Sequence, residues 1–152
     1  TASDWAGDQE SRISVSSYIL YFGSVAAAWR SRDQKRVSLS SSEAEYFALS
    51  ECVKDVRFVM KIMRELGVEP PIPVVVRIDN VGAMFMAENN TTSQRTRHID
   101  IRYKWVAEFI EAGEINVVFV KTDENDADIF TKNTSRVIHD KHVEKMMWTN
   151  KQ

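Results

Sequence analysis

Residues 13–22 place apolar side chains on both faces of an extended chain, at positions 13, 15, 19 and 21 on one face and 18, 20 and 22 on the other. This spacing is typical of a β-strand. Residues 25–29 follow Gly23, are rich in small side chains and are predicted to form the hairpin partner of that strand. The basic segment 30–36 that comes next is predicted to be a loop.

The pattern then changes to a repeat of three and four positions over residues 49–63, which predicts a helix with one apolar stripe. Ser42, with Glu45 three positions later, has the spacing of a capping box and predicts where this helix begins. Gly67 predicts its end. A second long helix is predicted over residues 98–112 by the same kind of repeat.

Two β-branched runs, at 74–78 and 115–120, predict two more strands, the first of which ends at Asp79. Short helices are expected near Ala83 and after residue 126, and a final helix from about Arg136. Antiparallel strands followed by crossover helices imply a mixed sheet with helices on both faces. The fold class is therefore α/β, and residues 1–152 are expected to form a single domain.

The composition of the chain bears on which partners it can bind and in which compartment it is expected. Its net charge of −2 provides no general attraction for nucleic acid, so any such binding requires a local cluster of basic residues. The single cysteine, Cys52, cannot form an internal disulfide and is expected to be a buried, inert thiol in a reducing, intracellular compartment. No apolar run is long enough to span a bilayer, and no secretion signal opens the sequence.

Three carboxylates lie at predicted element boundaries: Glu43 in the first turn of a helix, Asp79 after a strand and Asp128 at a short helix. Each has an ordinary alternative reading, as a helix cap or as an acid that complements a helix dipole. Together they indicate a Mg²⁺ site, because Mg²⁺ prefers oxygen ligands, and two such ions can assist phosphodiester cleavage. The sequence has no Cys/His set spaced for zinc, no nucleophile elbow and no phosphate-binding glycine loop.

Five blocks, in order along the chain, resemble the ribonuclease H domain of copia-type retrotransposons: residues 4–8, 40–46, 78–80, 95–102 and 127–132. The resemblance implies a ribonuclease H-like fold with a five-stranded mixed sheet. It also implies Mg²⁺-dependent cleavage of the RNA strand of an RNA–DNA hybrid, with two Mg²⁺ ions for which Mn²⁺ could substitute. A reverse transcriptase domain of the same polyprotein is the implied partner, and the expected location is the cytoplasm or a retroelement particle.

The resemblance assigns Glu43, Asp79 and Asp128 to the second, third and fourth catalytic and metal-binding acids. The first acid of the family is replaced by Ala2, which predicts strongly reduced cleavage. Asp4, two residues further on, could point the same way but lies about 7 Å too far along a strand. The chain is also expected to begin inside the first strand of the domain, so that this strand is truncated.

Seven residues are predicted to contact substrate, namely Asp4, Trp5, Asn80, Arg95, Arg97, His98 and Lys132. Basic residues at the start of a helix oppose its dipole, which favours a binding role, although a solvated face would explain them equally well. Packing is the favoured role of Trp5, and a structural or phosphate-binding role is favoured for His98 over proton transfer.

Ala2 leaves two explanations open: an engineered inactivating change, or natural decay of a domesticated copy. The second leads to an alternative function, a non-catalytic module that binds hybrids or proteins. An integrase-type strand transferase ranks low, because it would need a glutamate after two aspartates, and here the last acid is Asp128.

Overall fold

The computed structural model describes residues 1–4, 13–34, 38–88 and 97–147, without the side chains of 88, 97–101 and 103. The predicted order of elements is confirmed. They are β1 (Ala2–Asp4), β2 (Val15–Phe22), β3 (Val25–Asp33), α1 (Ser41–Glu65), β4 (Val74–Ile78), α2 (Val81–Glu88), α3 (Arg97–Glu111), β5 (Ile115–Phe119), the 3₁₀ helices η1 (Thr122–Glu124) and η2 (Asp126–Phe130), and α4 (Arg136–Met146).

The strands form two sheets, so the expected single five-stranded sheet is not shown as one continuous ladder. In the first, β1 pairs antiparallel with β2 and β2 pairs antiparallel with β3; in the second, β4 and β5 are parallel. β1 has only three residues, and the backbone nitrogen of Thr1 donates one hydrogen bond of 2.8 Å to Arg77 O of β4. One such bond links the two sheets at this point without forming a ladder.

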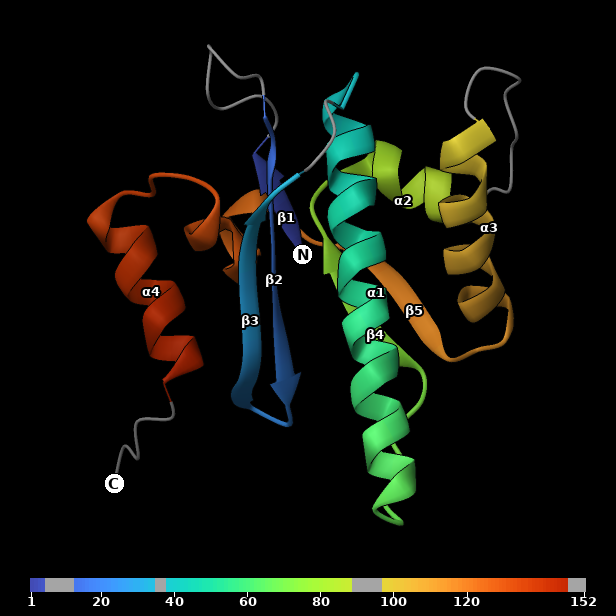
Figure 1. Ribbon diagram of the computed structural model, residues 1–152. Coiled ribbons are helices and arrows are strands. Elements are labelled where there is room, and N and C mark those ends of the chain that lie inside the picture. The colour runs from blue at the N-terminus through green and yellow to red at the C-terminus, as the bar shows by residue number, and fades with distance from the viewer. Residues whose placement is uncertain (5–12, 35–37, 89–96, 148–152) are drawn as a thin grey trace.

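Helices lie on both sides of the three-stranded sheet (Figure 1), with α1, α2 and α3 on one side and α4 on the other. The main core lies between α1 and the strands, and Leu49, Val53, Ile78 and Val106 are among its completely buried side chains. The apolar stripe predicted for α1 therefore faces this core. Cys52 is buried within it, as expected, and burial raises the pKa of its thiol.

Helix α1 begins two residues earlier than its predicted capping box. Its N-cap is Ser40, whose side chain accepts a hydrogen bond from the backbone N–H of Glu43. Oε2 of Glu43 in turn accepts a 2.7 Å hydrogen bond from the backbone N–H of Leu39. The helix start is therefore capped by Ser40 and Glu43, and Glu45 is released from the role that its spacing suggested.

Strand β3 continues through residues that were predicted to form a basic loop. It extends to Asp33 because β2 offers it a pairing partner as far as Val15. Arg30 is thereby fixed on the strand, where its guanidinium forms a 3.1 Å ion pair with Asp55 of α1. This part of the basic segment stabilises the junction of hairpin and helix.

A groove of about 520 Å³ separates β2 from β4. Its walls are Ile19–Phe22 of β2 and Val74–Arg77 of β4, and α1 supplies apolar side chains that include Val56, Met60 and Met63. Because β1 pairs only with Val15–Ser17, the remainder of β2 faces this groove along its length. In the described part of the chain, no helix is long and apolar enough to cross a membrane.

Candidate active site

Glu45 lies in the second turn of α1 with its side chain turned into the protein, where the residue is 5% exposed. Its Oε1 accepts a 2.7 Å hydrogen bond from the backbone N–H of Ser3 in β1. Burial, followed by the negative charge of Asp79, raises the pKa of Glu45 to about 7 and outweighs the hydrogen bonds from Ser3. Glu45 is therefore a desolvated carboxylate held against β1.

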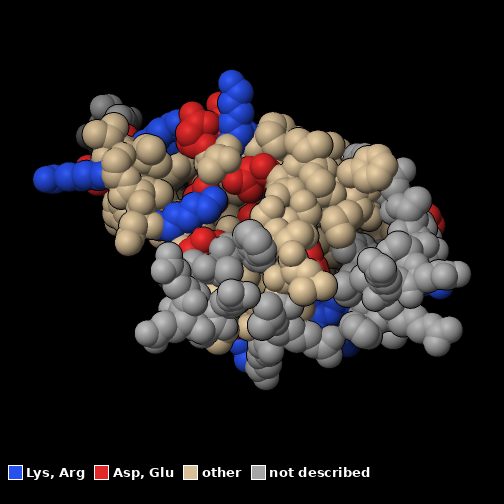
Figure 2. All heavy atoms as spheres, turned by 90° about the horizontal axis from the view of Figure 1, so that it is seen from above, with Lys and Arg blue, Asp and Glu red and all other residues tan. Residues whose placement is uncertain are grey.

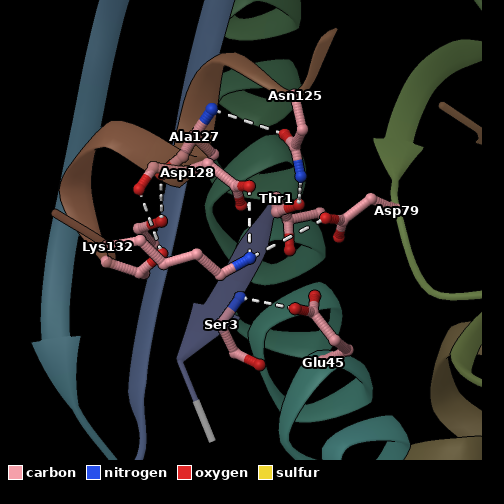
Figure 3. Close-up of polar contacts among 10 residues, drawn as sticks. Thr1, Ser3, Glu45, Asp79, Asn125, Ala127, Asp128 and Lys132 are labelled. Atoms are coloured by element: carbon pink, nitrogen blue, oxygen red, sulfur yellow. Dashed lines mark hydrogen bonds and ion pairs between the residues drawn. The ribbon is translucent and has the colours of Figure 1, made fainter. Parts of the chain in front are cut away.

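Asp79 and Asp128 come from different elements and meet at one ammonium group (Figure 3). Asp79 follows the last residue of β4, and Asp128 lies in η2. Nζ of Lys132 is 3.1 Å from Asp128 Oδ2 and 4.0 Å from Asp79 Oδ2. Burial raises the pKa of Asp128, and the nearby Asp79 adds to this effect, while the charge of Lys132 opposes it.

Unpaired polar atoms gather around these carboxylates. Among the described residues, seven buried side-chain oxygen or nitrogen atoms have no hydrogen-bond partner, and five belong to Thr1, Ser3, Glu45, Asp79 and Asp128. Each of the three acids contributes one such oxygen. Buried acceptors without partners are costly, so their concentration in one place indicates a site built to receive a ligand.

The chemistry of this donor set fits Mg²⁺, which binds carboxylate oxygens. The three carboxylates are too far apart to bind one metal ion together: within the described ranges, no group of three Asp, Glu, His or Cys side chains is placed to hold a metal ion. Lys132 lies between Asp79 and Asp128 and supplies the positive charge there.

Ala2 is completely buried and pairs with Ser17 across the β1–β2 ladder. Directly paired residues share a face of the sheet, and Oγ of Ser17 donates to Ala127 O of η2. Position 2 therefore faces η2, the element that carries Asp128. An aspartate there would add a fourth carboxylate on that side.

Two predicted site residues have structural roles at this junction. Glu43 binds the backbone of Leu39, as described above, whereas Asn80 Oδ1 accepts hydrogen bonds from Ala83 N and from Ser42 Oγ. Asn80, rather than Asp79, thus caps a free backbone N–H at the start of α2. The alternative reading of Asp79 as a helix cap is therefore wrong. In the same way, Asn125 caps η2 through its side chain and Asp128 does not.

The other predicted contacts are spread more widely. Asp4 is half-buried at the end of β1, and Lys132 contacts the acidic residues directly. Trp5 and Arg95 lie outside the described residues. Arg97 and His98 begin the backbone of α3, but their side chains are also outside the described part.

Glu45 is the residue that pattern reading missed. It lies four positions before Leu49 and eight before Val53, so it continues the apolar stripe of α1 toward the start of the helix. A glutamate on a buried stripe was the available signal. The three acids that the fold brings together are Glu45, Asp79 and Asp128, with Glu43 turned instead toward the backbone of Leu39.

The surface around the site has mixed charge. Figure 2, seen from above, shows acidic side chains gathered near the middle of the face, with basic side chains beside them. Asp126, next to the site in η2, has Oδ1 2.6 Å from Nδ1 of the buried His142 and 3.2 Å from Nζ of Lys145. These contacts attach α4 to η2, so that the segment carrying Asp128 is held from both sides.

The chain is similar to parts of three plant transposon proteins. It is 36% identical over 89% of its length to the "Retrovirus-related Pol polyprotein from transposon RE2" of Arabidopsis thaliana, and 36% over 88% to that of transposon RE1 from the same plant. It is 37% identical over 87% to the corresponding polyprotein of transposon TNT 1-94 of Nicotiana tabacum. No family model and no solved structure matches the chain. The chain spans only 9–10% of these polyproteins, so it is related to one segment of retrotransposon Pol polyproteins.

Proposed function

We propose that this chain is the ribonuclease H domain of a retrotransposon polyprotein, and that its site cleaves the RNA strand of an RNA–DNA hybrid. The observation that carries the proposal is the cluster of buried, unpartnered oxygens on Glu45, Asp79 and Asp128. The similarity to Pol polyproteins supports a role in reverse transcription. The same similarity supports a reverse transcriptase domain as the partner and an intracellular particle as the setting.

Glu45, Asp79 and Asp128 would hold Mg²⁺, or Mn²⁺ in its place. Two bound ions would supply positive charge to the scissile phosphodiester and make water a better nucleophile. The chain itself supplies the orientation: the Ser3 amide fixes Glu45, the end of β4 fixes Asp79 and η2 fixes Asp128. These fixed positions support the proposal, because phosphoryl transfer depends mainly on the positioning of charge.

Ala2 makes the present sequence a weak catalyst in this account. An aspartate at position 2 would complete the set of acids that could hold the ions, and its absence is expected to lower cleavage on the order of 10³-fold or more. Trp5, Arg95, Arg97 and His98, together with Asp4, remain proposed contacts for the hybrid.

We propose further that the two sheets are halves of one five-stranded sheet. The groove between β2 and β4 would hold the missing part of the first strand, formed by residues that precede Thr1 in such a polyprotein. Support comes from the hydrogen bond between Thr1, the residue before β1, and Arg77 of β4 at one end of the groove.

The test compares the chain with its Ala2→Asp variant on a labelled RNA–DNA hybrid in Mg²⁺, measuring binding and cleavage separately. The proposal expects both proteins to bind and the variant to cut the RNA strand far faster. A variant that folds and binds hybrid but never cuts would contradict it. That result would favour the second candidate, a non-catalytic hybrid-binding module, to which the buried Ala2 already points.

A further inference from the structure

Lys132 reaches the acidic cluster from the residue after the C-cap of η2. Its Nζ contacts Oδ2 of both Asp79 and Asp128, and the two carboxylate side chains are only 6% and 5% exposed. Lys132 itself is 38% exposed, so its stem runs along the surface and its charged end enters the site. A surface lysine usually keeps its ammonium group in solvent, whereas that of Lys132 contacts two nearly buried carboxylates.

The ammonium group of Lys132 pairs with only half of the aspartate oxygens at the site. It contacts one oxygen of Asp79 and one of Asp128, while the Oδ1 atom of each remains buried without a partner. A cation that binds carboxylates through both oxygens would satisfy more of these acceptors than the ammonium does. It would also have to compete with Lys132 for the two Oδ2 atoms, because both positive charges cannot occupy that position.

Charge balance leads to the same conclusion. When all three carboxylates are ionised, they and the ammonium together carry a net charge of −2, which one divalent cation neutralises. Replacing Lys132 by a neutral residue, or Ala2 by aspartate, would each make the cluster more negative by one. Only the two changes together give four carboxylates and no ammonium group. The net charge of such a cluster is −4, which two divalent cations neutralise.

We propose that Lys132 is the resident counter-ion of this site and takes one of its two cation positions, so that the chain binds a single divalent ion while Lys132 stays in place. This inference rests on the proposed function, because it takes the acids to be metal ligands. Lys132 is thus a positioning residue: it holds Asp79 and Asp128 together and must leave before a second ion binds.

The alternative is that Lys132 is only structural, and a second lysine provides the matched control. Lys145 Nζ lies 3.2 Å from Asp126 Oδ1, a lysine–aspartate pair of the same kind in an adjoining contact. If Lys132 acted through stability alone, Lys132→Met and Lys145→Met would change metal binding alike. The proposal expects a change in metal binding from Lys132→Met only.

The experiment is calorimetric titration of Mn²⁺ at pH 8, without nucleic acid, into the chain, Lys132→Met, Lys132→Arg, Lys145→Met, Ala2→Asp, and Ala2→Asp with Lys132→Met. We expect one ion for the chain, the same for Lys132→Arg and Lys145→Met, and affinity for that ion at least about tenfold tighter in Lys132→Met. The double variant is expected to bind two ions. Thermal unfolding with and without Mn²⁺ gives a second readout, and Lys132→Met should show the larger rise in melting temperature.

Two results would overturn the inference: two Mn²⁺ ions bound by the chain with Lys132 in place, or no gain in affinity in Lys132→Met. Lys132→Arg keeps the proposal testable if Lys132→Met does not fold, because two ions bound in the presence of the guanidinium would also contradict it. Failure of every variant, including Ala2→Asp, to bind Mn²⁺ would instead reject the proposed metal-dependent function.

Discussion

The backbone N–H of Ser3 donates a 2.7 Å hydrogen bond to Oε1 of Glu45, joining β1 to the second turn of α1 across 42 residues of sequence. Ser3 is the neighbour of Ala2, so this bond fixes the glutamate beside the position that we propose to be that of the first acid. The other oxygen of Glu45 is buried and unpartnered. The relationship makes Glu45, and not Glu43, the acid that belongs with Asp79 and Asp128.

Glu45 should make the metal-free protein less stable as pH rises. Its pKa is raised from 4.5 to about 7 by burial, so the folded state holds a proton that the unfolded chain has already released. Below pH 4.5 both states are protonated and there is no penalty; the penalty grows from 4.5 to 7 and is complete above 7. We expect Glu45→Gln to raise the free energy of unfolding above pH 7 by on the order of 3 kcal/mol.

Urea unfolding in a chelator at pH 4 and pH 8 measures this effect, and Glu43→Gln is the control on the same helix. A Glu45→Gln variant that is no more stable than the parent at pH 8 would show that the carboxylate is not the buried charge described here.

Asp126 should have the opposite dependence. Burial alone would raise its pKa, but hydrogen bonds from His142 and Lys145 and the charge of Lys145 outweigh it and hold the pKa below 3.8. A lowered pKa means that this stability is present above about pH 4 and is lost as pH falls through the folded pKa. Asp126→Asn is expected to cost about 1–3 kcal/mol at pH 7.

The cost of Asp126→Asn should shrink toward zero in acid, and unfolding curves at pH 7 and pH 3 test this. Asp140→Asn is the control, since Asp140 forms its 3.7 Å pair with Arg136 on an open surface. Equal effects of the two substitutions at pH 7 would show that α4 is not attached through Asp126.

Gly82 should resist replacement by alanine, although alanine is normally the better residue in a helix. A Cβ at this position would lie 2.4 Å from Ser42 Oγ and 3.1 Å from Asn80 Oδ1, so either these side chains or the contact of α2 with the start of α1 would have to shift. We expect Gly82→Ala to destabilise the protein by about 1–3 kcal/mol. Thermal unfolding measures it, and Gly82→Ala combined with Ser42→Ala, which removes the nearest atom, should recover part of the loss.

Much of the fold followed from periodicity, whereas the identity of the site glutamate did not. The helix and strand order could be predicted because apolar spacing is a local property of the sequence. The start of α1 was ambiguous: Ser40 with Glu43 and Ser42 with Glu45 both satisfy capping-box spacing, and the two choices exchange the roles of the glutamates. Only burial against β1 decides between them, and that contact is 42 residues away in sequence.

The contact of Lys132 with both aspartates could likewise not be predicted from the spacing of residues along the sequence. Lys132 is four residues from Asp128 in the sequence, but its approach to Asp79 depends on how η2 lies against the end of β4. A single five-stranded sheet could not be read from the sequence for a related reason: its continuity depends on backbone bonds between β1 and β4, and in the described residues the bond from Thr1, next to β1, to Arg77 is the one that joins them.

An added strand in the groove between β2 and β4 should show strict register dependence. Tyr18 and Leu20 of β2 pack into the core against α1, so alternate positions of a strand beside them would face the same way. Five residues of alternating valine and threonine placed before Thr1 should raise the melting temperature when valines occupy the second and fourth positions ahead of it. The reversed order puts valines toward Asp126 and should give little gain.

Hydrogen exchange of β2 and β4 provides the structural readout for these extensions. Equal protection by both orders, or by neither, would argue against a strand position in the groove.

The most direct measurement of the central claim is RNA cleavage in an RNA–DNA hybrid by three proteins in Mg²⁺: Ala2→Asp alone, Ala2→Asp with Glu45→Gln, and Ala2→Asp with Glu43→Gln. If Glu45, Asp79 and Asp128 form the catalytic site, Glu45→Gln should reduce the restored cleavage on the order of 10³-fold, and Glu43→Gln should leave most of it. Cleavage that survives Glu45→Gln but is lost with Glu43→Gln, in folded proteins, would contradict the site proposed for this chain.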